Sequence, residues 1–253
     1  MPATTIAIAT HKGGTGKTVT AMALSSALAR ARKRTLLIDL DPQGHSTLGL
    51  GVEVADGEPT LRDLFVEPPL PIDRVVKQTH LKGLHIVPAN IRLERLAHAL
   101  YMRPKREELL KRALQPVIND YDFVVIDCPP SLGVLTETGI ASARLVIVPC
   151  LMEARAADGL VDLLEVVSVL KGDHFDEWRI LLTRVDSRKT TTNQAVMAAL
   201  HQWKGKMFKN SIPQSEPLNQ AQIQRTDIFT FDRRCKGALA YQALTKEVLK
   251  YGN

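Results

Sequence analysis

Short apolar segments recur along this chain, and most of them end at a glycine, a proline or a charged residue. They are continuous rather than alternating with polar residues, which is typical of strands buried on both faces. These predicted strands are residues 5–9, 35–38, 84–87, 123–126, 145–148 and 180–182. Between them, apolar residues recur at helical spacing. The predicted helices are residues 20–29, 61–65, 91–100, 105–119, 154–170, 192–203 and 237–249.

The alternation of strands and helices predicts an α/β fold. A strand, a crossover helix and a second strand form a parallel pair, so most of the sheet should be parallel. We therefore expect one domain over residues 1–253, a doubly wound, mostly parallel sheet flanked by helices. The proline-rich segment 67–71 should lie outside the sheet, because proline cannot donate a backbone hydrogen bond.

The segment between the first predicted strand and helix is rich in glycine. Residues 11–18 read His-Lys-Gly-Gly-Thr-Gly-Lys-Thr. A strand, such a turn and a helix start form a phosphate-binding loop, whose backbone N–H groups surround an anion. In this loop Lys17 would reach the β- and γ-phosphates, and the Thr18 hydroxyl would bind Mg²⁺. The alternative is an ordinary glycine-rich turn before a helix.

Carboxylates follow two further predicted strands. Asp39 and Asp41 end the strand at 35–38, and Asp127 ends the strand at 123–126. The carboxyl ends of parallel strands are where doubly wound folds bind ligands. Asp127 has the position of a Walker B aspartate, which holds Mg²⁺ directly or through water. Two carboxylates in a loop can also simply form a turn or a helix cap.

Composition excludes several classes of protein. The three cysteines are far apart and lack metal-ligand spacing, which argues for a reducing compartment. No apolar run approaches the roughly 18 residues of a membrane span, and the first strand begins too early for a signal peptide. We therefore expect a soluble cytosolic protein. Residues 178–212 hold seven basic residues and one acidic residue, whereas the remainder is balanced. This basic segment indicates a polyanionic partner, or else a solvated face.

Three motifs resemble those of the ParA/MinD family of ATPases. Lys-Gly-Gly-Thr-Gly-Lys-Thr at 12–18 is similar to the deviant Walker A loop, with its additional lysine at Lys12. Asp-Leu-Asp-Pro-Gln-Gly at 39–44 is similar to switch I, and Asp-Cys-Pro-Pro-Ser at 127–131 to switch II. The resemblance covers residues 4–250, with 50–120 and 215–235 matching less well.

The resemblance implies a Mg²⁺·ATP site and an ATP-dependent homodimer. Lys12 would reach the partner's nucleotide, Lys17 would hold the phosphates, and Asp41 would orient or deprotonate the attacking water. Thr18, Asp39 and Asp127 would form the metal site. The nucleotide-binding residues would be Lys12, Gly13, Gly14, Thr15, Gly16, Lys17, Thr18, Val19 and, bordering the base, Pro213.

One segment raises the question of ATP or GTP. GTPases recognise guanine with an Asn/Thr-Lys-x-Asp segment, and residues 183–186 read Thr-Arg-Val-Asp. The lysine of that motif is replaced by arginine, and the resemblance implies a loop that faces adenine. We therefore expect ATP.

Within the family, the resemblance favours the short ParA/Soj type. Only ten residues precede the loop, too few for a DNA-binding helix-turn-helix, and no basic membrane-binding helix follows the last helix. The nitrogenase iron-protein branch of the family needs cysteines that bind an iron–sulfur cluster, and Cys128, the cysteine near Walker B, has no suitable partner. This type is a partition ATPase that positions plasmids, chromosomes or protein cargo on non-specific DNA. It is cytoplasmic and nucleoid-associated rather than membrane-bound, and a ParB-like protein or cargo adaptor stimulates its slow hydrolysis.

The expected DNA contacts lie in the C-terminal third of the chain. The candidates are Lys204, Lys206, Lys209, Arg225 and Arg234. Three alternatives stay open: a MinD-like spatial regulator, a metabolic P-loop kinase with a small acceptor, and a binding switch whose hydrolysis is incidental.

Overall fold

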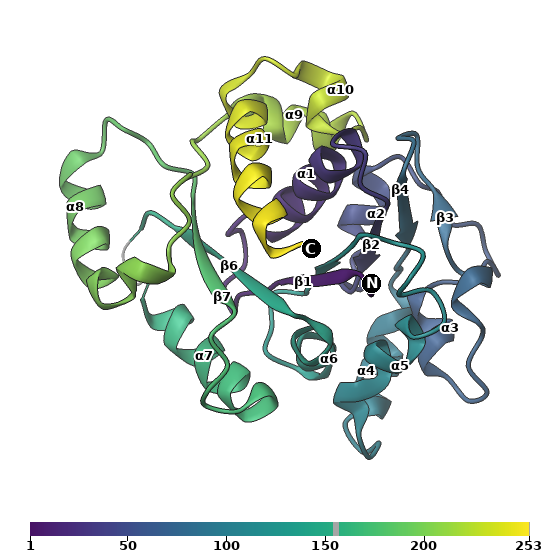
Figure 1. Cartoon of the computed structure of the whole chain (residues 1–253). Helices are drawn as coiled ribbons and strands as arrows, with labels where there is room; N and C mark the ends of the chain where they lie inside the picture. Colours follow the sequence, from purple (N-terminus) through teal and green to yellow (C-terminus); the bar gives the residue numbers. More distant parts are fainter. Residues whose placement is uncertain (154–156, 253) are drawn as a thin grey trace.

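A mostly parallel sheet forms the centre of the fold. The computed structural model describes residues 1–153 and 157–252. Within them, seven strands form one sheet in the order β3-β4-β2-β5-β1-β6-β7 (Figure 1). The strands are β1 (Thr4–Ile8), β2 (Thr35–Asp39), β3 (Lys77–Gln78), β4 (Leu84–Val87), β5 (Phe123–Asp127), β6 (Leu145–Leu151) and β7 (Trp178–Thr183). Every neighbouring pair is parallel except β3 and β4, so the predicted fold class is confirmed.

Helices cover both faces of this sheet. They are α1 (Lys17–Arg30), α2 (His45–Gly49), α3 (Leu61–Phe65), α4 (Arg92–Leu100), α5 (Leu109–Leu114), α6 (Val134–Ser142), α7 (Asp158–Lys171), α8 (Thr190–Ala199), α9 (Glu216–Ile223), α10 (Ile228–Asp232) and α11 (Lys236–Val248). Short 3₁₀ turns are η1 (Ile72–Arg74), η2 (Arg106–Glu108), η3 (His201–Lys206) and η4 (Leu249–Tyr251). None of the helices in the described ranges is long and apolar enough to cross a membrane.

Successive residues of each central strand enter two different cores. In β5, Val124 and Ile126 pack with α4 to α7, whereas Phe123 and Val125 pack with α1 and α11. Figure 1 shows these two helical layers above and below the sheet. Because both faces are buried, the strands are continuously apolar, as the sequence indicated.

Several predicted elements differ in extent. The helix expected over 105–119 is only η2 and α5, because Pro116 lacks the N–H that would continue it. The helix expected over 192–203 is α8 followed by η3, with non-helical backbone at Trp203. The start expected at residue 154 lies outside the described residues, and α7 is described from Asp158. β3, α2, α6, α9 and α10 were not predicted.

The strand ends bring the chemistry-bearing segments together. Ile8 of β1 and Asp39 of β2 both pair in register with Asp127 of β5. The loop at 9–16, the segment at 40–44 and the segment at 128–133 therefore leave the sheet side by side.

Candidate functional site

The loop between β1 and α1 is shaped to receive an anion. Gly14 and Gly16 have φ of 72° and 90°, in the left-handed region that favours glycine. α1 begins at Lys17, and no side chain caps its first turn. Its first N–H groups therefore attract negative charge. The Thr183 hydroxyl, at the end of β7, donates to the Thr15 carbonyl at 2.8 Å and holds the loop against the sheet. This arrangement is that of a phosphate-binding loop.

The two lysines of this loop have different surroundings. Lys17 is buried, and its Nζ donates to the Lys12 carbonyl at 3.1 Å. Burial lowers the pKa of Lys17, although the nearby Asp127 acts in the opposite direction. The Lys12 side chain is 49% exposed, and its Nζ lies 3.6 Å from a Glu153 carboxylate oxygen. Lys17 is thus placed inside the site and Lys12 at its outer surface.

The buried aspartates Asp39 and Asp127 end neighbouring strands. Burial raises the pKa of Asp39 to about 6 and that of Asp127 to about 7, and repulsion from Asp39 adds to the effect on Asp127. Ser46 Oγ donates to Asp127 Oδ2 at 2.5 Å. Asp127 Oδ1 is buried with no hydrogen-bond partner among the described residues.

A buried carboxylate oxygen without a partner is unfavourable unless a cation binds it. The Thr18 side chain also lies near enough to Asp127 to affect its pKa. Carboxylate and hydroxyl oxygens are suited to a hard cation such as Mg²⁺. Thr18 and Asp127 therefore fit the magnesium site that the motifs predict.

Both oxygens of Asp39 are used within the protein. Oδ2 accepts hydrogen bonds from the Thr47 backbone N–H (2.8 Å) and hydroxyl (2.7 Å), and Oδ1 accepts from the Asp41 N–H (3.2 Å). Asp39 thereby holds both the loop that carries Asp41 and the start of α2. Its role as a metal ligand stays a prediction.

Asp41 occupies a tight turn next to the phosphate-binding loop. It is 8% exposed, and the Gln43 N–H donates to its Oδ1 at 2.9 Å. Gly44 completes the turn with φ of 65°, and a Cβ there would lie 2.8 Å from the Ala89 carbonyl oxygen. The turn therefore requires glycine, and it fixes Asp41 where a carboxylate could position a water near bound phosphate.

A cleft of about 560 Å³ opens between this loop and helices α2 and α9. One side, the α2 wall, is formed by His45, Leu48 and Gly49. The opposite side, the α9 wall, is formed by Asn219, Gln222, Ile223 and Arg225. The remaining lining residues are Gly13, Gly14, Gly16, Lys17, Thr18, Val19, Asp41, Gln43, Pro130 and Arg184. The volume is that of a typical small-molecule site, which ranges from about 300 to 1,000 Å³.

Sequence reasoning missed the α9 wall. A signal for this helix was present, because Ser215 precedes Glu216 and Pro217, a typical helix start. Pro213 is not among the lining residues, but its backbone forms a bridge with Val185, directly after Arg184. Its contact with the base stays a prediction.

The segment 183–186 does not offer a free carboxylate to guanine. Arg188 donates to both oxygens of Asp186, from Nε at 2.9 Å and from NH2 at 2.7 Å. Because hydrogen bonds and charge from Arg188 hold this carboxylate, the pKa of Asp186 is lowered. In this structure the carboxylate that a guanine-binding segment would present is therefore engaged by Arg188.

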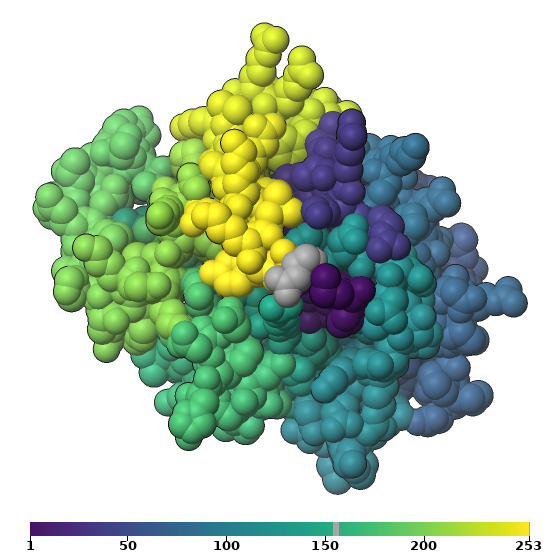
Figure 2. Space-filling view, in the orientation of Figure 1, coloured from purple at the N-terminus to yellow at the C-terminus, as the bar shows by residue number. Residues whose placement is uncertain are grey.

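The candidate DNA-binding residues lie in two separate groups. Lys204, Lys206 and Lys209 lie in or just after η3, whereas Arg225 and Arg234 flank α10. Figure 2 shows the α8–η3 region at the left edge of the molecule and the α9–α10 region at its top. Lys206 is ion-paired with Asp176, and Arg225 lines the cleft. The structure thus does not bring the five together on one chain, and their contact with DNA stays a prediction.

Comparison with known proteins identifies the family of this chain. Residues 3–180 match the family model described as an AAA domain. The sporulation initiation inhibitor protein Soj of Bacillus subtilis is 38% identical over 250 residues, which are 98% of each chain. The chromosome partitioning protein ParA of Myxococcus xanthus is 35% identical over 97% of this chain and 87% of its own.

A solved structure agrees in fold and was solved with the kind of ligands that the motifs predict. Cobyrinic acid a,c-diamide synthase from Mycobacterium smegmatis, solved with an ATP analogue and magnesium, has a TM-score of 0.84 and 31% identity. The match covers 98% of this chain and 95% of the synthase. The predicted family resemblance is confirmed by the two full-length relatives. The chain therefore belongs to the ParA/Soj family of P-loop partition ATPases.

Proposed function

We propose that this chain is an ATPase that dimerises with ATP and binds DNA non-specifically in that state. In this way it positions or segregates plasmid, chromosome or protein cargo, and hydrolysis releases the DNA. Membership of the ParA/Soj family supports a ParA-type positioning ATPase that uses ATP and Mg²⁺. The dimer, the DNA and the release step are the finer parts of the proposal.

The observation that carries the proposal is the contrast between the two lysines. Lys17 is buried beside the buried aspartates, so it serves the nucleotide of its own chain. Lys12 makes an ion pair with Glu153 in which both side chains are about half exposed. Such surface pairs contribute only about 0–1 kcal/mol, so the phosphates of a second chain's nucleotide could replace Glu153. Lys12 is therefore available to complete the site of a partner.

The remaining residues have roles that follow from their positions. The loop backbone and Lys17 hold the phosphates, while Thr18 and Asp127 hold Mg²⁺. Asp39 lies next to that site, and Asp41 positions the attacking water. Bound Mg²⁺ supplies neutralisation of the charge on the transferred phosphoryl group. Phosphoryl transfer depends mostly on positioning, so hydrolysis stays slow until a ParB-like protein or cargo adaptor improves it.

Dimerisation explains how ATP would control DNA binding. One chain offers few cations in any one region, and phosphate contacts with few cations are weak at physiological salt. Two copies joined by ATP would present the same cations twice, which makes the second contact effectively intramolecular. The protein would then associate with the nucleoid in its ATP state and leave it after hydrolysis.

Two assays test the proposal. Incubation with ATP and Mg²⁺ alone should yield ADP and phosphate, whereas a metabolic P-loop kinase would require an added acceptor. In mobility-shift assays, two unrelated DNA duplexes should bind equally with ATP and bind far less with ADP. Equal binding with ADP, or a strong preference for one duplex, would contradict the proposal. Binding to anionic vesicles instead of DNA would favour the MinD-like alternative.

A further inference from the structure

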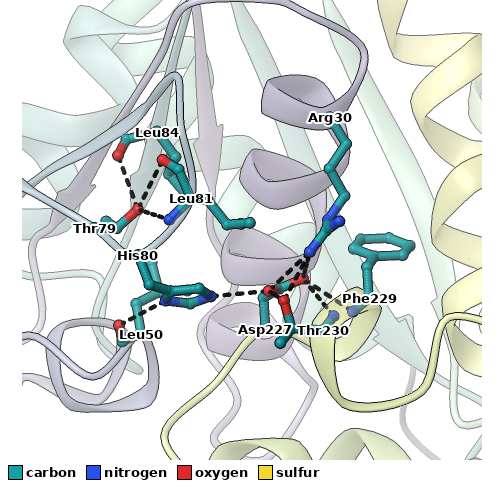
Figure 3. Close-up of polar contacts among 9 residues, drawn as sticks. All are labelled: Arg30, Leu50, Thr79, His80, Leu81, Leu84, Asp227, Phe229 and Thr230. Atoms are coloured by element: carbon teal, nitrogen blue, oxygen red, sulfur yellow. Dashed lines mark hydrogen bonds and ion pairs between the residues drawn. The ribbon is translucent and has the colours of Figure 1, made fainter.

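Asp227 lies outside the nucleotide cleft and joins several elements (Figure 3). Its buried Oδ1 accepts hydrogen bonds from the backbone N–H groups of Phe229 (2.9 Å) and Thr230 (3.2 Å), which caps α10. Arg30, the last residue of α1, donates to both carboxylate oxygens at 3.3 Å. His80, in the turn between β3 and β4, has its Nε2 2.9 Å from Asp227 Oδ2. A single carboxylate thus connects α1, α10 and the β3–β4 turn.

The second ring nitrogen of His80 also faces an acceptor. Its Nδ1 lies 3.3 Å from the carbonyl oxygen of Leu50. A carbonyl and a carboxylate can only accept, and a neutral imidazole has only one N–H to donate. The two contacts are satisfied together only when His80 carries a proton on both nitrogens. The geometry is therefore that of an imidazolium bridge between Leu50 and Asp227.

The two ends of this bridge lie next to the two walls of the cleft in the sequence. Leu50 directly follows α2, and Asp227 comes two residues after Arg225 of the α9 wall. The walls also touch through backbone. Arg225 has φ of 51°, and a Cβ at Gly51 would lie 3.0 Å from the Arg225 carbonyl oxygen. A change in the His80 bridge would therefore act on the separation of the walls.

We propose that His80 and Asp227 are positioning residues that hold the α2 wall against the α9 wall, and that protonation of His80 strengthens nucleotide binding. This inference rests on the proposed function, because it takes the cleft to be the Mg²⁺·ATP site. Neither His80 nor Asp227 is among the described lining residues of the cleft. Their effect is on binding rather than on the chemical step.

Charged groups from several described elements surround His80. Asp227 is its direct partner and has a fully buried side chain. A cavity of about 420 Å³, which His80 helps to line, gives the ring access to solvent. Its lining also includes the charged residues Glu53, Lys77 and Arg225. Lys77 is paired with Glu58 and Arg225 with Glu53, whereas Arg30 and His80 share the carboxylate of Asp227.

The test compares two histidine variants, His80→Gln and the control His85→Gln. His85 lies in β4, where its Nδ1 is 2.9 Å from the Tyr121 hydroxyl, and it is not among the described lining residues of the cleft. Affinity for a non-hydrolysable ATP analogue with Mg²⁺ is measured by calorimetry at pH 6 and pH 8. Glutamine cannot gain a charge, so His80→Gln should bind about three- to tenfold more weakly than wild type at pH 6 and equally at pH 8. His85→Gln should bind with the affinity of wild type at pH 6 and at pH 8. This control accounts for any change in affinity that comes from protonation of the nucleotide itself.

A second comparison separates binding from chemistry. Asp227→Asn keeps a good N-cap for α10 but loses the charge that faces His80 and Arg30. It should raise the KM for ATP several-fold and leave kcat unchanged. Asp122→Asn, which removes another carboxylate bound by an arginine, should change neither.

Two outcomes would overturn this inference but leave the proposed function intact. One is a nucleotide affinity of His80→Gln that depends on pH as in wild type, and the other is a fall in kcat without a change in KM for Asp227→Asn. Wild-type protein that bound no nucleotide at either pH would overturn the proposed function, and this inference with it.

Discussion

Asp39 and Asp127 are paired in register at the ends of β2 and β5, yet the two carboxylates differ in their hydrogen-bond partners. Asp39 accepts three hydrogen bonds from Asp41 and Thr47. Asp127 keeps one oxygen without a partner among the described residues. The first aspartate therefore organises the loop that carries Asp41, and the second is the one with an oxygen left for a cation.

Asp127→Asn should abolish the effect of Mg²⁺ on nucleotide binding. An amide cannot replace an anionic oxygen ligand, so turnover should fall about 100-fold or more. In thermal unfolding, wild type should be stabilised more by ADP with Mg²⁺ than by ADP with EDTA, and the variant should show no such difference. Asp122→Asn, directly before the start of β5, is the matched control and should behave as wild type. A normal Mg²⁺ response in Asp127→Asn would exclude the proposed metal site.

Lys12→Ala should bind ATP but remain monomeric, because the variant lacks only the interaction with the partner's nucleotide. Asp41→Ala should bind ATP, lose turnover by about 10²- to 10⁴-fold and accumulate as a dimer. Size-exclusion chromatography with light scattering, with ATP present, measures both outcomes. Glu153→Ala removes the partner of Lys12 within the chain and should still dimerise. A dimer of Lys12→Ala as stable as wild type would show that this lysine does not act across the interface.

Asp227 should contribute stability that depends on pH. Burial by itself would raise the pKa of Asp227, but hydrogen bonds from Thr230 and His80 and the charge of Arg30 outweigh it and lower the pKa. A lowered pKa in the folded state stabilises the fold above the unfolded value of about 3.9, and this contribution is lost as pH falls through the folded value.

Asp227→Asn should therefore reduce the free energy of unfolding by about 1–3 kcal/mol at neutral pH. The difference from wild type should shrink as the pH falls below about 3.9, and it should vanish only below the lowered folded-state pKa of Asp227, where both proteins carry a neutral group. Urea unfolding followed by circular dichroism across this range gives the two values. A difference that did not change with pH would mean that the ionised carboxylate is not the source.

Replacing Lys204, Lys209 and Arg234 together by alanine should weaken DNA binding equally for all sequences. These three exposed side chains make no ion pair among the described residues, unlike Lys206 and Arg225. The slope of log affinity against log salt should decrease by about 0.9 for each phosphate that the variant no longer neutralises. The control replaces Arg74, Lys82 and Lys105, which are also exposed but lie on the other half of the chain. Equal slopes for the two triple variants would assign the DNA contact to other residues.

The sequence by itself determined the fold class, the phosphate-binding loop and the three acidic positions. These features are local: a strand, residues 12–18 and a helix follow one another directly, and buried parallel strands are marked by continuous apolar runs. The same locality explains why short elements were missed. β3 has two residues, and α10 has five, so neither leaves a periodic pattern.

Only the tertiary structure decided which residues complete the site. The α9 wall is far along the chain from Lys17, and no local sequence pattern indicates that this wall and Lys17 line the same cleft. Which aspartate keeps an unpartnered oxygen depends on Thr47 and Ser46, which α2 places against the strand ends. His80 and Asp227 are 147 residues apart, and each is unremarkable in sequence. Their contact arises because packing of α10 against α1, α9 and α11 buries Asp227, and a buried carboxylate must find donors wherever the fold provides them.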